Sequence, residues 1–163
     1  MTARLPVTRA LAALVEHVTE RPCGMGELPR VRRKSGWDAA PAPYTVLDSL
    51  PAEFDGPPLW DWHADAAWSY QVTSVGERVD QVEWLADRVR AGVVGRTDGQ
   101  WTHDLHLPQA QVMDRELTYD AGGESSESAA GAIVSYVQRV TITVTSACRN
   151  DSSDPHRGGP RGR

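Results

Sequence analysis

The chain of 163 residues is 24% charged and 40% hydrophobic, which predicts one folded domain of ordinary size. Its net charge is -5; the last fifteen residues contribute +2, so residues 1–148 carry -7. An acidic body argues against sequence-independent binding of nucleic acid. Two cysteines are too few for a disulfide framework, and no apolar run approaches the ~20 residues of a membrane span.

A helix is predicted over residues 6–20, because apolar residues recur there at spacings of three and four. Residues 24–43 are rich in Gly and Pro and are predicted to form a long loop. Loops of this length are commonly functional or disordered. Its basic run contains Arg30, Arg32, Arg33 and Lys34.

Two strands and a second helix are predicted next. The first strand covers residues 44–50 and ends at a turn that begins with Pro51. The second covers residues 66–75, where alternating apolar and polar residues indicate one dry face and one wet face. Apolar residues then recur three and four apart from Val79 to Val93, which predicts a helix.

The last two strands are predicted over residues 111–119 and 132–147. The final strand would span ~46 Å at ~3.3 Å per residue, against ~17–20 Å for a typical strand. The hairpin is therefore expected to project beyond the core or to bend sharply. Its connecting loop, residues 120–131, is rich in Gly, Ser and Glu and is expected to be mobile.

The predicted order of elements is α-β-β-α-β-β. Each strand has one apolar face and each helix one apolar stripe, so the expected class is α+β. We expect a mainly antiparallel four-stranded sheet with two helices on one face, and a projecting hairpin of its third and fourth strands. Residues 1–148 would form this single domain, and residues 149–163, which contain no apolar anchor, a disordered tail.

None of the candidate catalytic or ligand motifs fits its sequence context. The Gly-rich segment 24–26 follows a helix and lacks the third Gly of a dinucleotide fingerprint. His103 and His106 have metal-ligand spacing but lie in a predicted loop without further ligands. Residues 61–65 alternate two acids and a His without an accompanying nucleophile. We therefore expect no enzyme activity, no cofactor and no metal.

The remaining candidates are surfaces. Trp68 is predicted to lie in the core, and Trp84 to stack with Arg88 one helical turn away. The basic run could contact DNA phosphates, an acidic protein face or only solvent. Four tryptophans lie in predicted loops, where they either bind a partner or fold back onto the sheet: Trp37, Trp60, Trp62 and Trp101.

Four segments of the chain form a recognisable set: Tyr70–Glu77, Gln81–Arg90, Val112–Leu117 and Ser135–Arg139. They resemble tail terminator proteins of long-tailed, siphovirus-type phages that infect actinobacteria. The similarity follows the order of elements over residues 5–147 and is strongest over residues 68–90.

The resemblance implies a structural virion protein made in the host cytoplasm. Tail terminators form a ring, usually a hexamer, on the head-proximal end of the tail tube. They stop tube polymerisation and join the tail to the head connector. The implied partners are further copies of the chain, the major tail tube protein and the head–tail connector protein, with DNA passing through the lumen without specific binding. No catalytic residues are implied.

Subunit contacts are predicted at the loop tryptophans, the long hairpin and the basic run. Two alternatives stay open: another neck or tail-completion protein, or a small ligand-binding or enzymatic α+β domain that uses residues 60–65 as a pocket wall. The predicted contact residues are Trp60, Trp62, Trp101, Arg115, Tyr119, Glu124, Glu127, Tyr136 and Arg139, with the basic residues Arg30, Arg32, Arg33 and Lys34.

Overall fold

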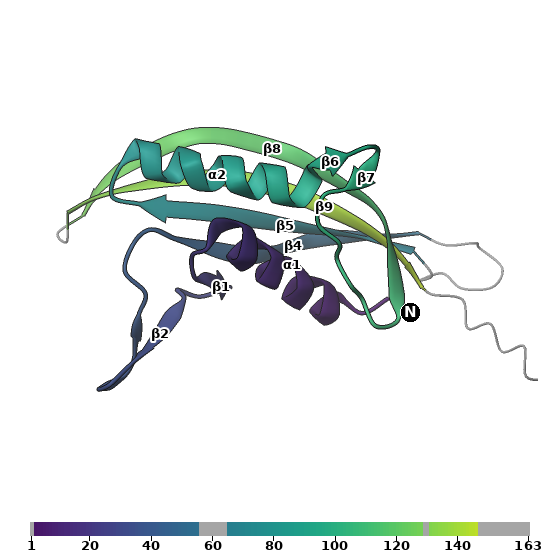
Figure 1. Ribbon diagram of the computed structural model, residues 1–163, viewed down its shortest axis with the longest axis horizontal. Helices are drawn as coiled ribbons and strands as arrows, with labels where there is room; N and C mark the ends of the chain where they lie inside the picture. Colours follow the sequence, from purple (N-terminus) through teal and green to yellow (C-terminus); the bar gives the residue numbers. More distant parts are fainter. Residues whose placement is uncertain (1, 56–64, 129–130, 147–163) are drawn as a thin grey trace, which may run out of the picture.

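The computed structural model describes residues 2–55, 65–128 and 131–146, in which two helices pack on one face of a sheet (Figure 1). Helix α1 spans Arg4–Thr19 and helix α2 spans Val79–Val94. In spatial order, the five strands of the sheet are β1 (Cys23–Met25), β4 (Tyr44–Asp55), β5 (Asp65–Gly76), β9 (Gly131–Ser146) and β8 (Ala110–Ser128). Two small hairpins pair β2 (Arg30–Arg33) with β3 (Gly36–Ala39), and β6 (Arg96–Thr97) with β7 (Gln100–Trp101).

The predicted fold class is wrong in its sheet and in its order of elements. The sheet has five strands and is mixed, and the described elements run α-β-β-β-β-β-α-β-β-β-β. Strand β1 makes it mixed, because β1 pairs in parallel with β4 whereas the other neighbours pair antiparallel. A strand of three residues is too short to display a period-two alternation, so the sequence pattern could not reveal it.

The predicted loop over residues 24–43 is also wrong, because β2 and β3 form an antiparallel hairpin inside it. Arg30 lies opposite Ala39, and Arg33 lies opposite Gly36. Gly36 has a φ of 134°, a conformation that L side chains rarely adopt, next to the turn at Lys34 and Ser35. Exposed side chains on both faces conceal the apolar–polar alternation that normally identifies a strand.

Two strands continue past their predicted ends. Strand β4 passes Pro51 through a shift of register between Ser49 and Ala52; a bulge near a sheet edge accommodates a proline, which has no N–H to donate. Strand β8 runs through the segment predicted as a mobile loop, with Glu124 opposite Ser135. The β8–β9 hairpin is therefore longer than expected, and β8 curves over α2 (Figure 1).

The core lies between the helices and the sheet. Every second residue of β5, from Ala66 to Gly76, is buried. Trp68 is 6% exposed, which confirms its predicted place in the core. The helices approach closely at Gly92 of α2, where an added Cβ would lie 2.7 Å from Val18 Cγ1 of α1. Among the described residues, neither helix is long and apolar enough to span a bilayer.

Candidate interaction surfaces

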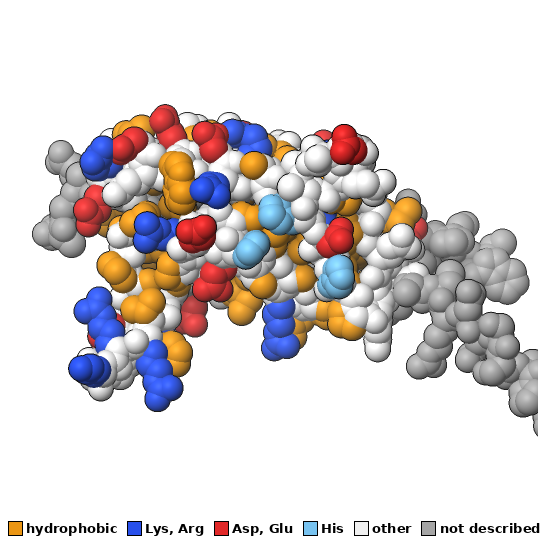
Figure 2. All heavy atoms as spheres, in the orientation of Figure 1, with side chains coloured by type: hydrophobic (Ala, Val, Ile, Leu, Met, Phe, Trp, Pro, Cys, Tyr) orange, Lys and Arg blue, Asp and Glu red, His pale blue; other side chains and the backbone are white. Residues whose placement is uncertain are grey.

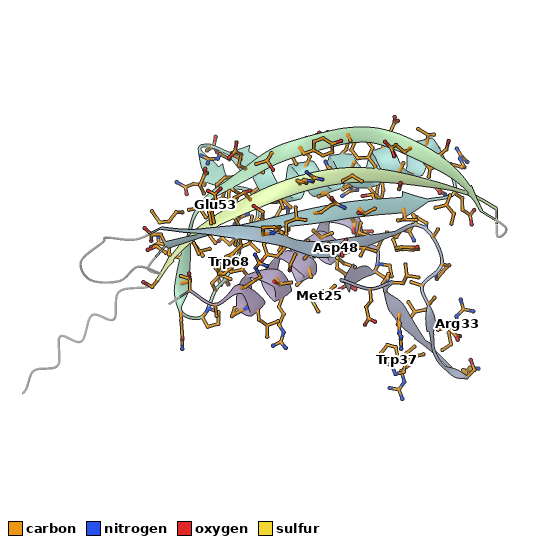
Figure 3. All side chains as sticks on the ribbon, turned by 180° about the vertical axis from the view of Figure 1, so that it is seen from behind. Met25, Arg33, Trp37, Asp48, Glu53 and Trp68 are labelled. Carbon is orange, nitrogen blue, oxygen red and sulfur yellow. The ribbon has the colours of Figure 1, made fainter. Side chains whose placement is uncertain are left out.

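The sheet face opposite the helices is left uncovered by the described chain, as Figure 3 shows from behind. Hydroxyl and small aliphatic side chains form much of this face; Ser69 Oγ and Thr141 Oγ1, for example, lie 3.1 Å apart. On the same face, Arg139 donates to Gln71 at 3.3 Å and lies 5.1 Å from the Tyr119 ring. Carboxylates outnumber this one guanidinium: Asp48, Glu53 and Asp65 lie on the face or at its end, and Glu116 and Glu124 lie along its β8 edge.

The β2–β3 hairpin, residues 30–39, projects beyond the β1–β4 side of the sheet, and we call it the arm (Figure 1). Arg32 and Trp37 lie directly opposite each other and therefore share one face of the arm. Trp37 is 66% exposed. Arg33 lies 3.7 Å from Asp38, whereas Arg30 and Arg32 form no ion pair with a described residue. Blue basic side chains accordingly gather around the arm in Figure 2.

A groove of about 410 Å³ lies at the base of the arm. Exposed Met25, Leu28 and Trp37 line it together with the charged residues Glu16, Glu27 and Arg30, so apolar and polar surface both face the groove. Clustered exposed apolar side chains mark interaction sites more often than isolated ones do. Cys23 also lines the groove, but burial raises the pKa of its thiol, so the cysteine is not activated as a nucleophile.

Strand β8 forms the opposite edge of the sheet. Its pairing with β9 shifts register three times, between Val112 and Asp114, between Leu117 and Tyr119, and between Ala121 and Glu124. Bulges of this kind twist an edge and interrupt its main-chain ladder, which disfavours extension by a further strand. A partner at this edge would therefore meet mainly side chains. The exposed side chains include those of Met113, Glu116, Tyr119 and Glu124.

A polar cluster fastens α2 to β8 and β9. Gln138 is fully buried and donates from Nε2 to Ala86 O and to Asp120 Oδ1, both at 3.2 Å. Burial alone would raise the pKa of Asp120, but hydrogen bonds from Arg90, Tyr136 and Gln138 outweigh it and lower the pKa. The pKa of Tyr136 is raised, first by burial and then by Asp120. These contacts all lie within one chain, where Asp120 is the partner of Tyr136.

Arg115 and Trp101, two of the predicted contact residues, contact each other within the chain. The Arg115 side chain is buried and donates to His103 O at 2.8 Å and to Val93 O at 3.4 Å. Its guanidinium lies 4.8 Å from the Trp101 ring centroid, and that of Arg96 lies 3.9 Å from the same ring. Burial lowers the pKa of Arg115. These contacts fasten the segment after α2 to β8.

The structure separates the other predicted contact residues. Trp60 and Trp62 lie outside the described residues. Glu124 is exposed on β8, and the backbone of Glu127 pairs with that of Ala132. Two groups of predicted contact residues are therefore exposed. One is the four basic residues of the arm, and the other is Tyr119, Glu124 and Arg139 on strands β8 and β9. Met25 and Leu28 were missed, because single apolar residues between glycines and prolines form no periodic pattern.

Two smaller predictions concern pairs of side chains. The guanidinium of Arg88 lies 5.0 Å from the Trp84 ring centroid, which confirms the predicted stacking. His103 packs edge-on against His17, with 5.8 Å between ring centroids. In the described part of the chain, no group of three or more His, Cys, Asp or Glu side chains is placed to hold a metal ion. The possible acid–base motif at residues 61–65 lies outside the described residues, except for Asp65.

Comparison with known proteins adds a distant likeness. No protein-family model matches the sequence, and no curated protein matches it. Among solved structures, the chain is similar to one described as "Virion of native gene transfer agent (GTA) particle", with 11% sequence identity and a TM-score of 0.44. The alignment covers 84% of this chain and 94% of that chain. This neighbour is a virion component.

Proposed function

We propose that this chain is a structural virion protein that forms a ring at the head-proximal end of a phage tail, as a tail terminator does. Its role is to present surfaces and not to catalyse a reaction. The uncovered sheet face is the observation that carries the proposal, since a large ordered sheet face that no helix covers is available to contact something else. We assign it to the lumen through which DNA passes.

The chemistry of this face supports that assignment. Binding to a DNA backbone requires Lys and Arg that displace counterions. This face presents hydroxyl groups, small aliphatic groups and carboxylates. Its Arg139 already donates a hydrogen bond to Gln71 and stacks on the Tyr119 ring. Phosphates would be repelled by the carboxylates and would find no row of cations. Such a wall lets DNA slide without holding it.

The two sides of the sheet support ring formation. A closed ring uses heterologous contacts, in which two different patches of each subunit meet. The sheet ends in two different sides, the short β1 beside β4 and the long, bulged β8. The arm extends beyond the first side in both ribbon views and does not lie over the open face (Figures 1 and 3). A lumen lined by Arg30, Arg32 and Lys34 without carboxylate partners would contradict this arrangement.

Native mass spectrometry and negative-stain imaging test the ring, with the chain alone and with the chain mixed with tail tubes. We expect rings at one end of each tube and tubes that no longer elongate. A chain that stays monomeric and never adds to tubes would overturn the proposal.

A pair of matched variants tests the lumen. Thr73 and Thr143 lie on the open face and are half-buried. Replacing both with Lys should create salt-sensitive DNA binding, whereas replacing both with Glu should not. Equal DNA binding by the two variants would contradict the lumen assignment.

A further inference from the structure

We infer that the arm of one copy binds the β8 edge of a second copy, and that this is the head-to-tail contact of the ring. The inference rests on the proposed function, because it names the contact that would close that ring. Charge, exposed apolar groups and the positions of the two patches all point to it.

Charge complementarity is the first reason. Four cations and Asp38 give the arm +3, which leaves -8 on the rest of the chain. On β8, Asp114 is paired with Arg96 and Asp120 with Arg90. Glu116 and Glu124 are exposed and form no ion pair with a described residue. Opposite charges on two patches accelerate encounter and fix the orientation of the partners.

Exposed apolar groups are the second reason. The arm offers Trp37 and the groove beside Met25, and the β8 edge offers Met113, which is 58% exposed, and Tyr119. Trp and Arg are the residues most enriched among those that dominate binding energy at protein interfaces. A DNA duplex would neutralise the arginines but presents no apolar side chain to the groove. A protein partner therefore matches the arm better than nucleic acid does.

The positions of the two patches are the third reason. In the order β1-β4-β5-β9-β8, the arm follows the first side and β8 is the last strand. They lie on opposite sides of the subunit, with the arm below and β8 above in Figure 1. An arm that leaves one side of a subunit meets the β8 side of the next, and the contact repeats around the ring. The bulges of β8 make it a contact between side chains and not a shared β-ladder.

A charge-swap experiment tests the inference. The variants are Arg30→Glu with Arg32→Glu on the arm, Glu116→Arg with Glu124→Arg on β8, and the combination of all four. Arg9→Glu with Arg88→Glu is the matched control, because both residues are exposed and lie on helices away from the arm. Ring formation is measured by native mass and by imaging, free and on tail tubes, and circular dichroism checks that each variant folds.

We expect each double reversal to weaken subunit association by about tenfold or more, and the fourfold variant to recover most of the loss. The control should assemble like the unmodified chain. Rings that form equally well with the reversed arm would overturn this contact and leave the proposed function standing. An unmodified chain that never forms rings would overturn both. Arm-dependent binding of duplex DNA, with assembly unchanged by the reversed arm, would assign the arm to nucleic acid and also overturn the contact.

Discussion

Adjacent residues of β9 point to opposite faces of the sheet, one covered by the helices and one open. Val140 is fully buried beneath the helices, between Tyr70 and Leu117. Thr141 points to the open face, between Ser69 and Glu116. Alternation along the strand thus separates residues that stabilise the fold from residues available for contacts. Substitutions can therefore test the two faces separately.

The largest expected effect contrasts these two neighbours. Val140→Asn removes buried methyl groups and buries an amide, which should lower the free energy of unfolding by about 3 kcal/mol. Thr141→Asn introduces the same side chain on the open face and should cost no more than about 1 kcal/mol. Urea unfolding of the two variants measures the difference. Equal losses would mean that the open face is as tightly packed as the covered one.

A smaller effect is expected in the helix layer that covers the first face. Gly92→Ala should gain about 1 kcal/mol of helix propensity but lose about 1–3 kcal/mol to overpacking against Val18. The expected net result is a loss of about 1 kcal/mol. Val18→Ala should relieve most of the clash, so the double variant should be more stable than the two separate losses predict. Strict additivity in urea unfolding would contradict a direct contact.

Acidification should weaken the cluster that joins the helix layer to the β8 edge. The pKa of Asp120 is lowered in the folded chain, so its contribution to stability is present above the ordinary carboxylate pKa and is lost as the pH falls through the folded value. The stability difference between the unmodified chain and Asp120→Asn should therefore shrink as the pH is lowered. Urea unfolding at neutral and acidic pH measures it, and a constant difference would contradict the prediction.

The smallest effect on stability is expected at the arm. Trp37→Ala should change the free energy of unfolding by less than about 0.5 kcal/mol, because its ring is largely exposed. It should nevertheless weaken ring assembly on tail tubes. Trp84→Ala is the matched control, since Trp84 is also exposed but lies on α2. Assembly that tolerates the loss of Trp37 and fails without Trp84 would move the contact from the arm to the helix.

The candidate surfaces were only partly predictable. The basic residues of the arm stand out in the sequence, but the hairpin that carries them does not, because neither face of it is buried. Arg115 was predicted as a contact residue, but its side chain is buried. It lies inside because the carbonyl oxygens of Val93 and His103 accept its hydrogen bonds and Trp101 lies beside it. Those partners come from a different segment of the chain.

Local order was determined by the sequence itself. Spacings of three and four placed both helices, alternation gave β5 its two faces, and neighbours one turn apart predicted the contact of Trp84 with Arg88. These patterns join residues close in the chain, so the sequence displays them directly. Tertiary structure alone decided that β1 pairs in parallel with β4, that β8 continues through its glycines, and that one sheet face stays uncovered. Each of these depends on pairing or packing between segments that are distant in the chain. Local periodicity does not indicate which distant segments pair.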